Sequence, residues 1–144
     1  MQGSKKKRYA AKHGTRINVP DDLARHLRRA AQDGEIDCES AHTLAARLHL
    51  PPTEIGRAMD LLELRIVRCQ MGLFGYTPRK RIVTPTDKVA VEIEAQIRAA
   101  LQDGRLPCAA AWTLADSRGM TRLELANLCE ALKIKICACQ LGAF

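Results

Sequence analysis

The sequence predicts a mainly helical protein made of two tandem copies of one small module, each with three helices and a small β-hairpin. The first observation is an internal repeat: a shift of 70 residues aligns 22–74 with 92–144 without a gap, and 17 of the 53 pairs are identical. The second is that apolar residues recur every three or four positions within each copy, as on one face of a helix. The third is the composition, because 47% hydrophobic and 27% charged residues are typical of a folded globular chain.

The first helix of each copy is expected to end at a repeated Asp-Gly pair. In copy one, Pro20 suits the first helical position, and Gly34 can adopt the left-handed conformation that closes a helix. In copy two, Thr86 is the expected N-cap and Gly104 closes the helix in the same way.

The rest of each copy is predicted from apolar spacing and from runs of β-branched residues. The expected elements are second helices over 40–48 and 110–118, third helices over 53–64 and 122–132, and strands over 65–70 and 134–140. The chain therefore divides into a basic, disordered arm over 1–19, a first repeat over 20–83 and a second repeat over 84–144.

The second and third helices of each copy resemble a helix-turn-helix. That family places a small residue, here Ala45 and Ala115, in the middle of the first helix, where two helices cross closely. It places a residue with positive φ at the turn, which Gly119 supplies in copy two and His49 must supply in copy one. With the preceding helix and the following strands, each copy resembles a winged helix. The resemblance implies that the protein binds double-stranded DNA as a transcriptional regulator in a prokaryotic cytoplasm.

The resemblance also implies which side chains contact DNA. A third helix that enters the major groove presents the outward residues near its N-terminus to the bases. The base-reading candidates are Thr53 and Arg57 in copy one, and Arg122 and Asn127 in copy two. The candidates for phosphate contact are the wing residues Arg79, Lys80 and Arg81, together with Lys5, Lys6, Lys7 and Arg8 of the arm.

The charge is concentrated at the N-terminus. The net charge of +7 includes +6 from residues 1–20 and only +1 from residues 21–144. A basic arm is attracted to phosphate polymers, although a solubilising tail has the same composition. With the basic wing, the arm favours copy one as the main DNA-binding copy and gives copy two a supporting or dimerising role.

Cysteines recur in register, since Cys38 aligns with Cys108 and Cys69 with Cys139. Two thiols in each copy could bind a soft metal or be oxidised. Buried core thiols explain the same pattern, because the strand face that carries Cys69 is apolar and free cysteine is often buried. The second explanation is favoured, and no cofactor or metal is expected.

Other functional classes are disfavoured. The chain has no phosphate-binding glycine loop, no nucleophile–histidine–acid signature and no metal-spaced histidine pair, so an enzyme is not expected. No apolar run reaches the length of a membrane helix, and the lack of an export signal suggests reduced thiols in the cytoplasm. The alternatives to DNA binding are a winged-helix module for protein interaction or dimerisation, and a metal- or redox-responsive regulator that uses the repeated cysteines.

Overall fold

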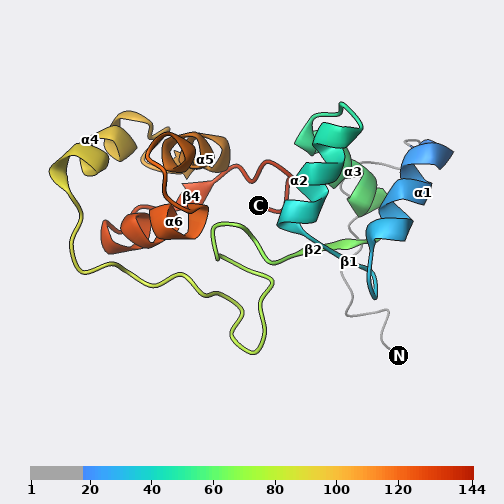
Figure 1. The fold of residues 1–144 in the computed structure, drawn as a ribbon, viewed down its shortest axis with the longest axis horizontal. Helices are drawn as coiled ribbons and strands as arrows, with labels where there is room; N and C mark the ends of the chain where they lie inside the picture. Colours follow the sequence, from blue (N-terminus) through green and yellow to red (C-terminus); the bar gives the residue numbers. More distant parts are fainter. Residues whose placement is uncertain (1–17) are drawn as a thin grey trace. The chain divides into compact units, whose positions relative to one another are not determined.

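The computed structural model describes residues 18–144 (Figure 1), and this range contains six helices and four short strands. The chain divides into two compact units, one up to Val67 and one from Arg68. The predicted arm over 1–19, with Lys5, Lys6, Lys7 and Arg8, lies almost entirely outside the described residues.

Each unit has the same order of elements. The first contains α1 (Asp21–Ala30), β1 (Glu35–Asp37), α2 (Cys38–Arg47), α3 (Pro52–Leu61) and β2 (Arg65–Val67). The second contains α4 (Val91–Ala99), β3 (Leu106–Pro107), α5 (Cys108–Ser117), α6 (Arg122–Ala131) and β4 (Ile136–Cys137). The predicted mainly helical class with small strands is confirmed.

Equivalent turns of the two copies have the same backbone conformation. His49 has a φ of 59° and Gly119, at the equivalent turn, has a φ of 67°. Glu63 and Lys133 both have a φ of 59°, although their charges are opposite. The left-handed conformation expected of His49 is therefore present, and the four-residue turns between α2 and α3 and between α5 and α6 are equivalent.

The predicted β-hairpins are wrong. β1 pairs with β2 in parallel, with Ile36 opposite Ile66, and β3 pairs with β4 in parallel, with Leu106 opposite Ile136. Two helices separate the paired strands in sequence, as a parallel connection requires. The basic residues 79–81 therefore do not stand at the tip of a hairpin wing, and the segment that contains them carries no strand.

Local capping explains where several helices begin. The Asp37 carboxylate accepts a hydrogen bond from the Ser40 amide at 2.8 Å at the start of α2. Thr121 and Glu124 form a reciprocal capping box at the start of α6. Thr86 is not the N-cap of α4, because that helix begins at Val91 with Ala90 as its N-cap. The Thr86 amide donates to the carbonyl of Asn127 on α6.

The segment that follows β2 belongs to the core of the second unit. Met71 is fully buried and Val83 is 7% exposed, and both belong to the same apolar cluster as Ile97 and Leu125. The sequence assigned this segment to the first repeat, with a boundary after residue 83. Its apolar side chains place it within the second compact unit, so the structural boundary falls after Val67.

Gly72 comes closer to its surroundings than its repeat counterpart does. Its φ is +77°, and an added Cβ would lie 2.5 Å from Cδ1 of Leu123 and 3.0 Å from Cγ1 of Ile82. Gly142 has a φ of +82°, and an added Cβ would meet nothing within 4 Å. The two positions share the backbone conformation and differ in packing.

We expect Gly72→Ala to lower the free energy of unfolding more than Gly142→Ala does. Both substitutions place a side chain in the left-handed region, at a cost of about 1 kcal/mol. Gly72→Ala also over-packs the core, which costs about 1–3 kcal/mol more. Urea unfolding of the two variants measures the difference, and equal losses of stability would contradict the packing argument.

Candidate nucleic-acid interface

The third helix of repeat one exposes little of its surface. Thr53 is exposed at its start, as expected of a groove-facing residue. Arg57 is only partly exposed, and its guanidinium is 2.8 Å from the carboxylate of Glu54. The buried residues of this helix are Ile55, Gly56, Ala58, Met59 and Asp60. Thr53 and Arg57 therefore lie on one narrow edge of α3.

The third helix of repeat two is covered along the face that holds Asn127. The side-chain oxygen of Asn127 accepts a hydrogen bond from the Thr84 amide at 2.9 Å, and its carbonyl accepts one from the Thr86 amide at 3.3 Å. Three residues before Thr84, the Arg81 guanidinium is 3.0 Å from the carboxylate of Glu130 on the same helix. The segment 81–86 thus lies along α6. Its Thr84 amide is bonded to the side-chain oxygen with which Asn127 would recognise adenine.

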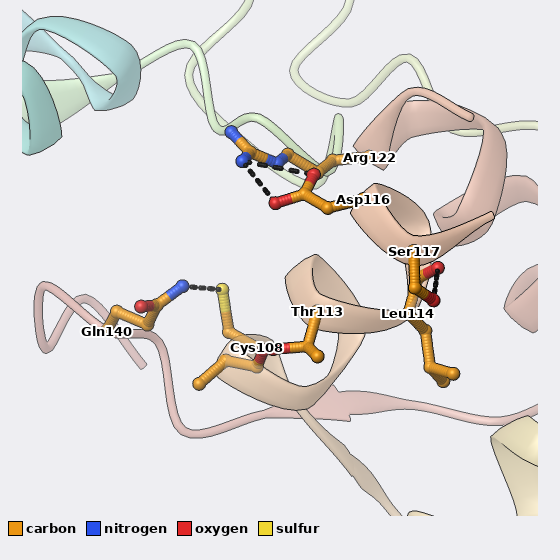
Figure 2. Close-up of polar contacts among 8 residues, drawn as sticks. Cys108, Thr113, Leu114, Asp116, Ser117, Arg122 and Gln140 are labelled. Atoms are coloured by element: carbon orange, nitrogen blue, oxygen red, sulfur yellow. Dashed lines mark hydrogen bonds and ion pairs between the residues drawn. The ribbon is translucent and has the colours of Figure 1, made fainter. Parts of the chain in front are cut away.

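Arg122 is also held within the second unit. Its guanidinium is 3.1 Å from the carboxylate of Asp116 and lies 3.7 Å from the ring centroid of Trp112. Figure 2 shows the Arg122 side chain turned back toward Asp116 of α5. The ion pair and the cation–π contact tie the start of α6 to α5, so Arg122 has a structural role whether or not it also contacts a phosphate.

Basic residues gather instead at a cavity of about 380 Å³ in the second unit. Arg81, Lys133 and Lys135 line it, and these three residues are called the basic cluster below. Glu130, the ion-pair partner of Arg81, lines it as well. Among residues 18–144, neither lysine has an acidic partner within ion-pair distance. The apolar part of the lining is Leu73, Ala126, Cys129, Ile134 and Ile136.

The two units differ in net charge as well. Residues 18–67 contain 9 acidic and 6 basic residues, whereas residues 68–144 contain 11 basic and 7 acidic residues. Arg79 and Lys80, which directly precede the cluster in the chain, are exposed. The basic character of the described residues therefore belongs to the second unit. Four of its basic residues, Arg68 and the predicted wing residues Arg79, Lys80 and Arg81, come from the part of the chain that the sequence assigned to repeat one.

Lys133 and Lys135 were not among the binding residues that the sequence predicted. Their counterparts in repeat one are Glu63 and Arg65, so the alignment of the copies already contained a reversal of charge at one position. This reversal of charge indicates, from the sequence alone, that the two copies differ at this surface position. Only the structure shows that Arg81, about fifty residues earlier in the chain, lines the same cavity.

Three of the four repeated cysteines lie in the second unit. Cys69 and Cys108 are each 5% exposed, and Cys139 is partly exposed. Burial raises the pKa of the Cys108 thiol, and a hydrogen bond from Gln140, whose Nε2 is 3.6 Å from the sulfur, lowers it in part. Burial alone raises the pKa of Cys129, on α6, to about 11. Cys38 is buried at the start of α2 in the first unit.

Other kinds of site are not formed in the described part of the chain. Within residues 18–144, no three His, Cys, Asp or Glu side chains are grouped so that they could hold a metal ion. The six helices of this range are too short or too polar to cross a membrane. Comparisons of the chain with protein-family models, with curated proteins and with solved structures find no match.

We expect Asn127→Ala to loosen the segment over α6 at one identifiable point. The Thr84 amide loses its acceptor, while the Thr86 amide keeps the carbonyl of residue 127. Hydrogen exchange measured by NMR should therefore accelerate at Thr84 more than at Thr86, with a loss of stability of about 1 kcal/mol. Equal exchange of both amides in the variant and the parent would show that the side chain does not anchor the segment.

The stability contributed by Cys129 should depend on pH. The folded protein holds the thiol proton more tightly than the unfolded chain, whose thiol has an ordinary pKa near 9. The contribution is therefore complete below pH 9 and is lost as the pH rises toward 11. Between pH 8 and pH 10, the stability difference between the parent and Cys129→Ala should change by about 1 kcal/mol at the parent's expense. Denaturant unfolding at both values measures it, and a constant difference would contradict the burial argument.

Proposed function

We propose that this protein binds double-stranded DNA as a transcriptional regulator, and that the basic cluster of the second unit makes its main phosphate contacts. The observation that carries the proposal is the presence of Arg81, Lys133 and Lys135 at one cavity, where neither lysine has an acidic ion-pair partner among residues 18–144. Arg81 is paired there with Glu130. Lysine and arginine side chains that neutralise phosphates supply most of the affinity of a protein for duplex DNA.

The helix pairs support the resemblance to helix-turn-helix proteins. α2 packs against α3 and α5 against α6, and each pair is joined by a four-residue turn with a left-handed residue. The parallel strands and the missing hairpin depart from a winged helix. The proposal therefore rests on the electrostatics of the second unit more than on the resemblance.

Phosphate contact and base reading are assigned to different residues. Arg79 and Lys80 are exposed beside the cluster and extend it along the chain. Thr53 and Arg57 remain the base-reading candidates of α3, where Thr53 is exposed. Asn127 and Arg122 would have to leave Thr84 and Asp116 before they could contact a base. Binding should thus be governed by salt, with a smaller contribution from base sequence.

The limited accessible surface of both third helices favours a second function. The accessible surface of α3 is narrow and the Asn127 face of α6 is covered, as in a module that binds another protein and not a groove. If the full chain fails to bind duplex DNA at low salt, the interaction module is the better explanation.

We expect the double substitution Lys133→Ala, Lys135→Ala to weaken binding of the full chain to duplexes of different sequence by a similar factor, about tenfold or more. The slope of log affinity against log salt should fall by up to about 0.9 for each lost phosphate contact. Fluorescence anisotropy with labelled duplexes at several salt concentrations measures both quantities.

The matched control is Lys88→Ala, Arg105→Ala, which removes the same charge from exposed positions that do not line the cavity. This control should bind nearly as well as the parent. If the control and the cluster variant lose affinity equally, net charge and not the cluster governs binding, and the proposed site is wrong.

A further inference from the structure

The cavity that the basic cluster lines also has an apolar floor. Its volume of about 380 Å³ lies within the range of about 300–1,000 Å³ that is usual for small-ligand pockets. The floor consists of Leu73, Ala126, Cys129, Ile134 and Ile136. Ala126, Cys129 and Ile134 are each no more than 8% exposed, so the cavity reaches down to the core of the unit. Charged side chains and an apolar surface therefore share one recess.

The end of α6 places charge and apolar surface at alternating positions of the chain. The Lys133 amide donates to the Glu130 carbonyl at 3.1 Å, and the Ile134 amide donates to the Cys129 carbonyl at 2.9 Å. These hydrogen bonds close the helix around Lys133, whose φ is 59°. Lys133 and Lys135 are exposed, whereas Ile134 between them is buried. The two lysines thus belong to the solvent-exposed rim of the cavity, and Ile134 belongs to its floor.

Lys135 lacks the acidic partner that its counterpart in repeat one has. The Arg65 guanidinium is 2.6 Å from the carboxylate of Glu35. The equivalent residues in repeat two are Lys135 and Arg105, and two like charges cannot form an ion pair. Lys133 also has no acidic ion-pair partner among residues 18–144. Both lysines are therefore available to an anion that comes from solution.

One carboxylate lines the cavity, and it already has a partner. Glu130 is 3.0 Å from the Arg81 guanidinium. The charged residues of the lining, three basic and one acidic, leave a net charge of +2. The cavity therefore attracts an anion, and the lysines are the groups that can bind it without the loss of an existing ion pair.

We propose that this cavity binds a small amphipathic carboxylate, with its carboxylate group on Lys133 and Lys135 and its alkyl chain on the apolar floor. Ammonium groups bind carboxylates through charge-assisted hydrogen bonds, and the transfer of methylene groups from water to an apolar surface strengthens binding. A DNA phosphate would use the lysines and leave the floor in contact with water. The inference therefore goes beyond the proposed function, although a carboxylate on these lysines would exclude a DNA phosphate from them.

The apolar floor predicts how affinity depends on the length of the alkyl chain. A fully buried methylene group strengthens binding about fourfold, and a half-buried one about twofold. Leu73 and Ile136 are partly exposed, so we take the lower value for the part of the chain that lies on them. Octanoate has four more methylene groups than butanoate and the same charge. It should therefore bind at least about tenfold more tightly.

The test is an NMR titration of the full chain with octanoate, butanoate and octanol at constant ionic strength, with no nucleic acid present. Octanoate should bind most tightly, and the signals of residues 133–136 should move. The proposal is overturned if octanoate does not bind, or if butanoate or octanol binds equally well, because charge or apolar contact alone would then suffice. Since DNA is absent, failure of this test and failure of the proposed function are separate results.

Two kinds of variant locate the site. Lys133→Ala and Lys135→Ala should each weaken octanoate binding at least about threefold, whereas the matched control Lys88→Ala, exposed and outside the cavity lining, should not. Ile136→Thr keeps a β-branched side chain in β4 and makes the floor more polar, so it should reduce the preference for octanoate over butanoate. Equal losses in the Lys88 and Lys133 variants would reject the cavity, as would shifts of the parent's signals confined to residues 18–67.

Discussion

The insertion of residues from the end of repeat one into the core of repeat two is the constraint on which the second unit depends. Met71 is fully buried there, and the Gly72 carbonyl accepts hydrogen bonds from the Ile82 and Val83 amides at 2.8 and 3.3 Å. An added Cβ on Gly72 would collide with Leu123 of α6, so the backbone can approach this closely only because the residue is glycine. This approach leads Arg81 to Glu130 and lays the following segment along α6.

Duplication has preserved the backbone and changed the chemistry. Glu63 and Lys133 have the same left-handed conformation at the same point of the repeat, yet one adds to the acidic first unit and the other to the basic cluster. Similarly, α3 carries Arg57 paired with Glu54, whereas α6 carries Asn127 held by the segment that precedes α4. Because side chains at equivalent positions meet different neighbours, the two copies can share a fold without sharing a binding function.

The cysteines show that burial alone does not define the role of a thiol. Cys129 and Cys69 both belong to the same buried apolar cluster, but Cys69 also receives hydrogen bonds from the backbone of its own loop. A thiol of the first kind contributes packing, and its proton is held more tightly as a consequence. For a thiol of the second kind, hydrogen bonds from the backbone offset part of the increase in pKa that burial causes.

The sequence by itself determined the duplication, the helix order and the left-handed turns, because these depend on residues close together in the chain. The 70-residue register and the left-handed residue at His49 and Gly119 were readable without coordinates. The Asp-Gly pairs were expected to close the first helices, and that expectation is wrong. α1 ends at Ala30 and α4 at Ala99, and each pair forms a tight turn with two positive φ values between hydrogen-bonded neighbours. Only the tertiary structure decided the parallel pairing of the strands, the boundary after Val67, the covering of α6 and the place of Arg81 at the cavity that Lys133 lines. Each of these depends on contacts between residues far apart in sequence, and apolar periodicity carries no information on which partner a buried strand or segment will meet.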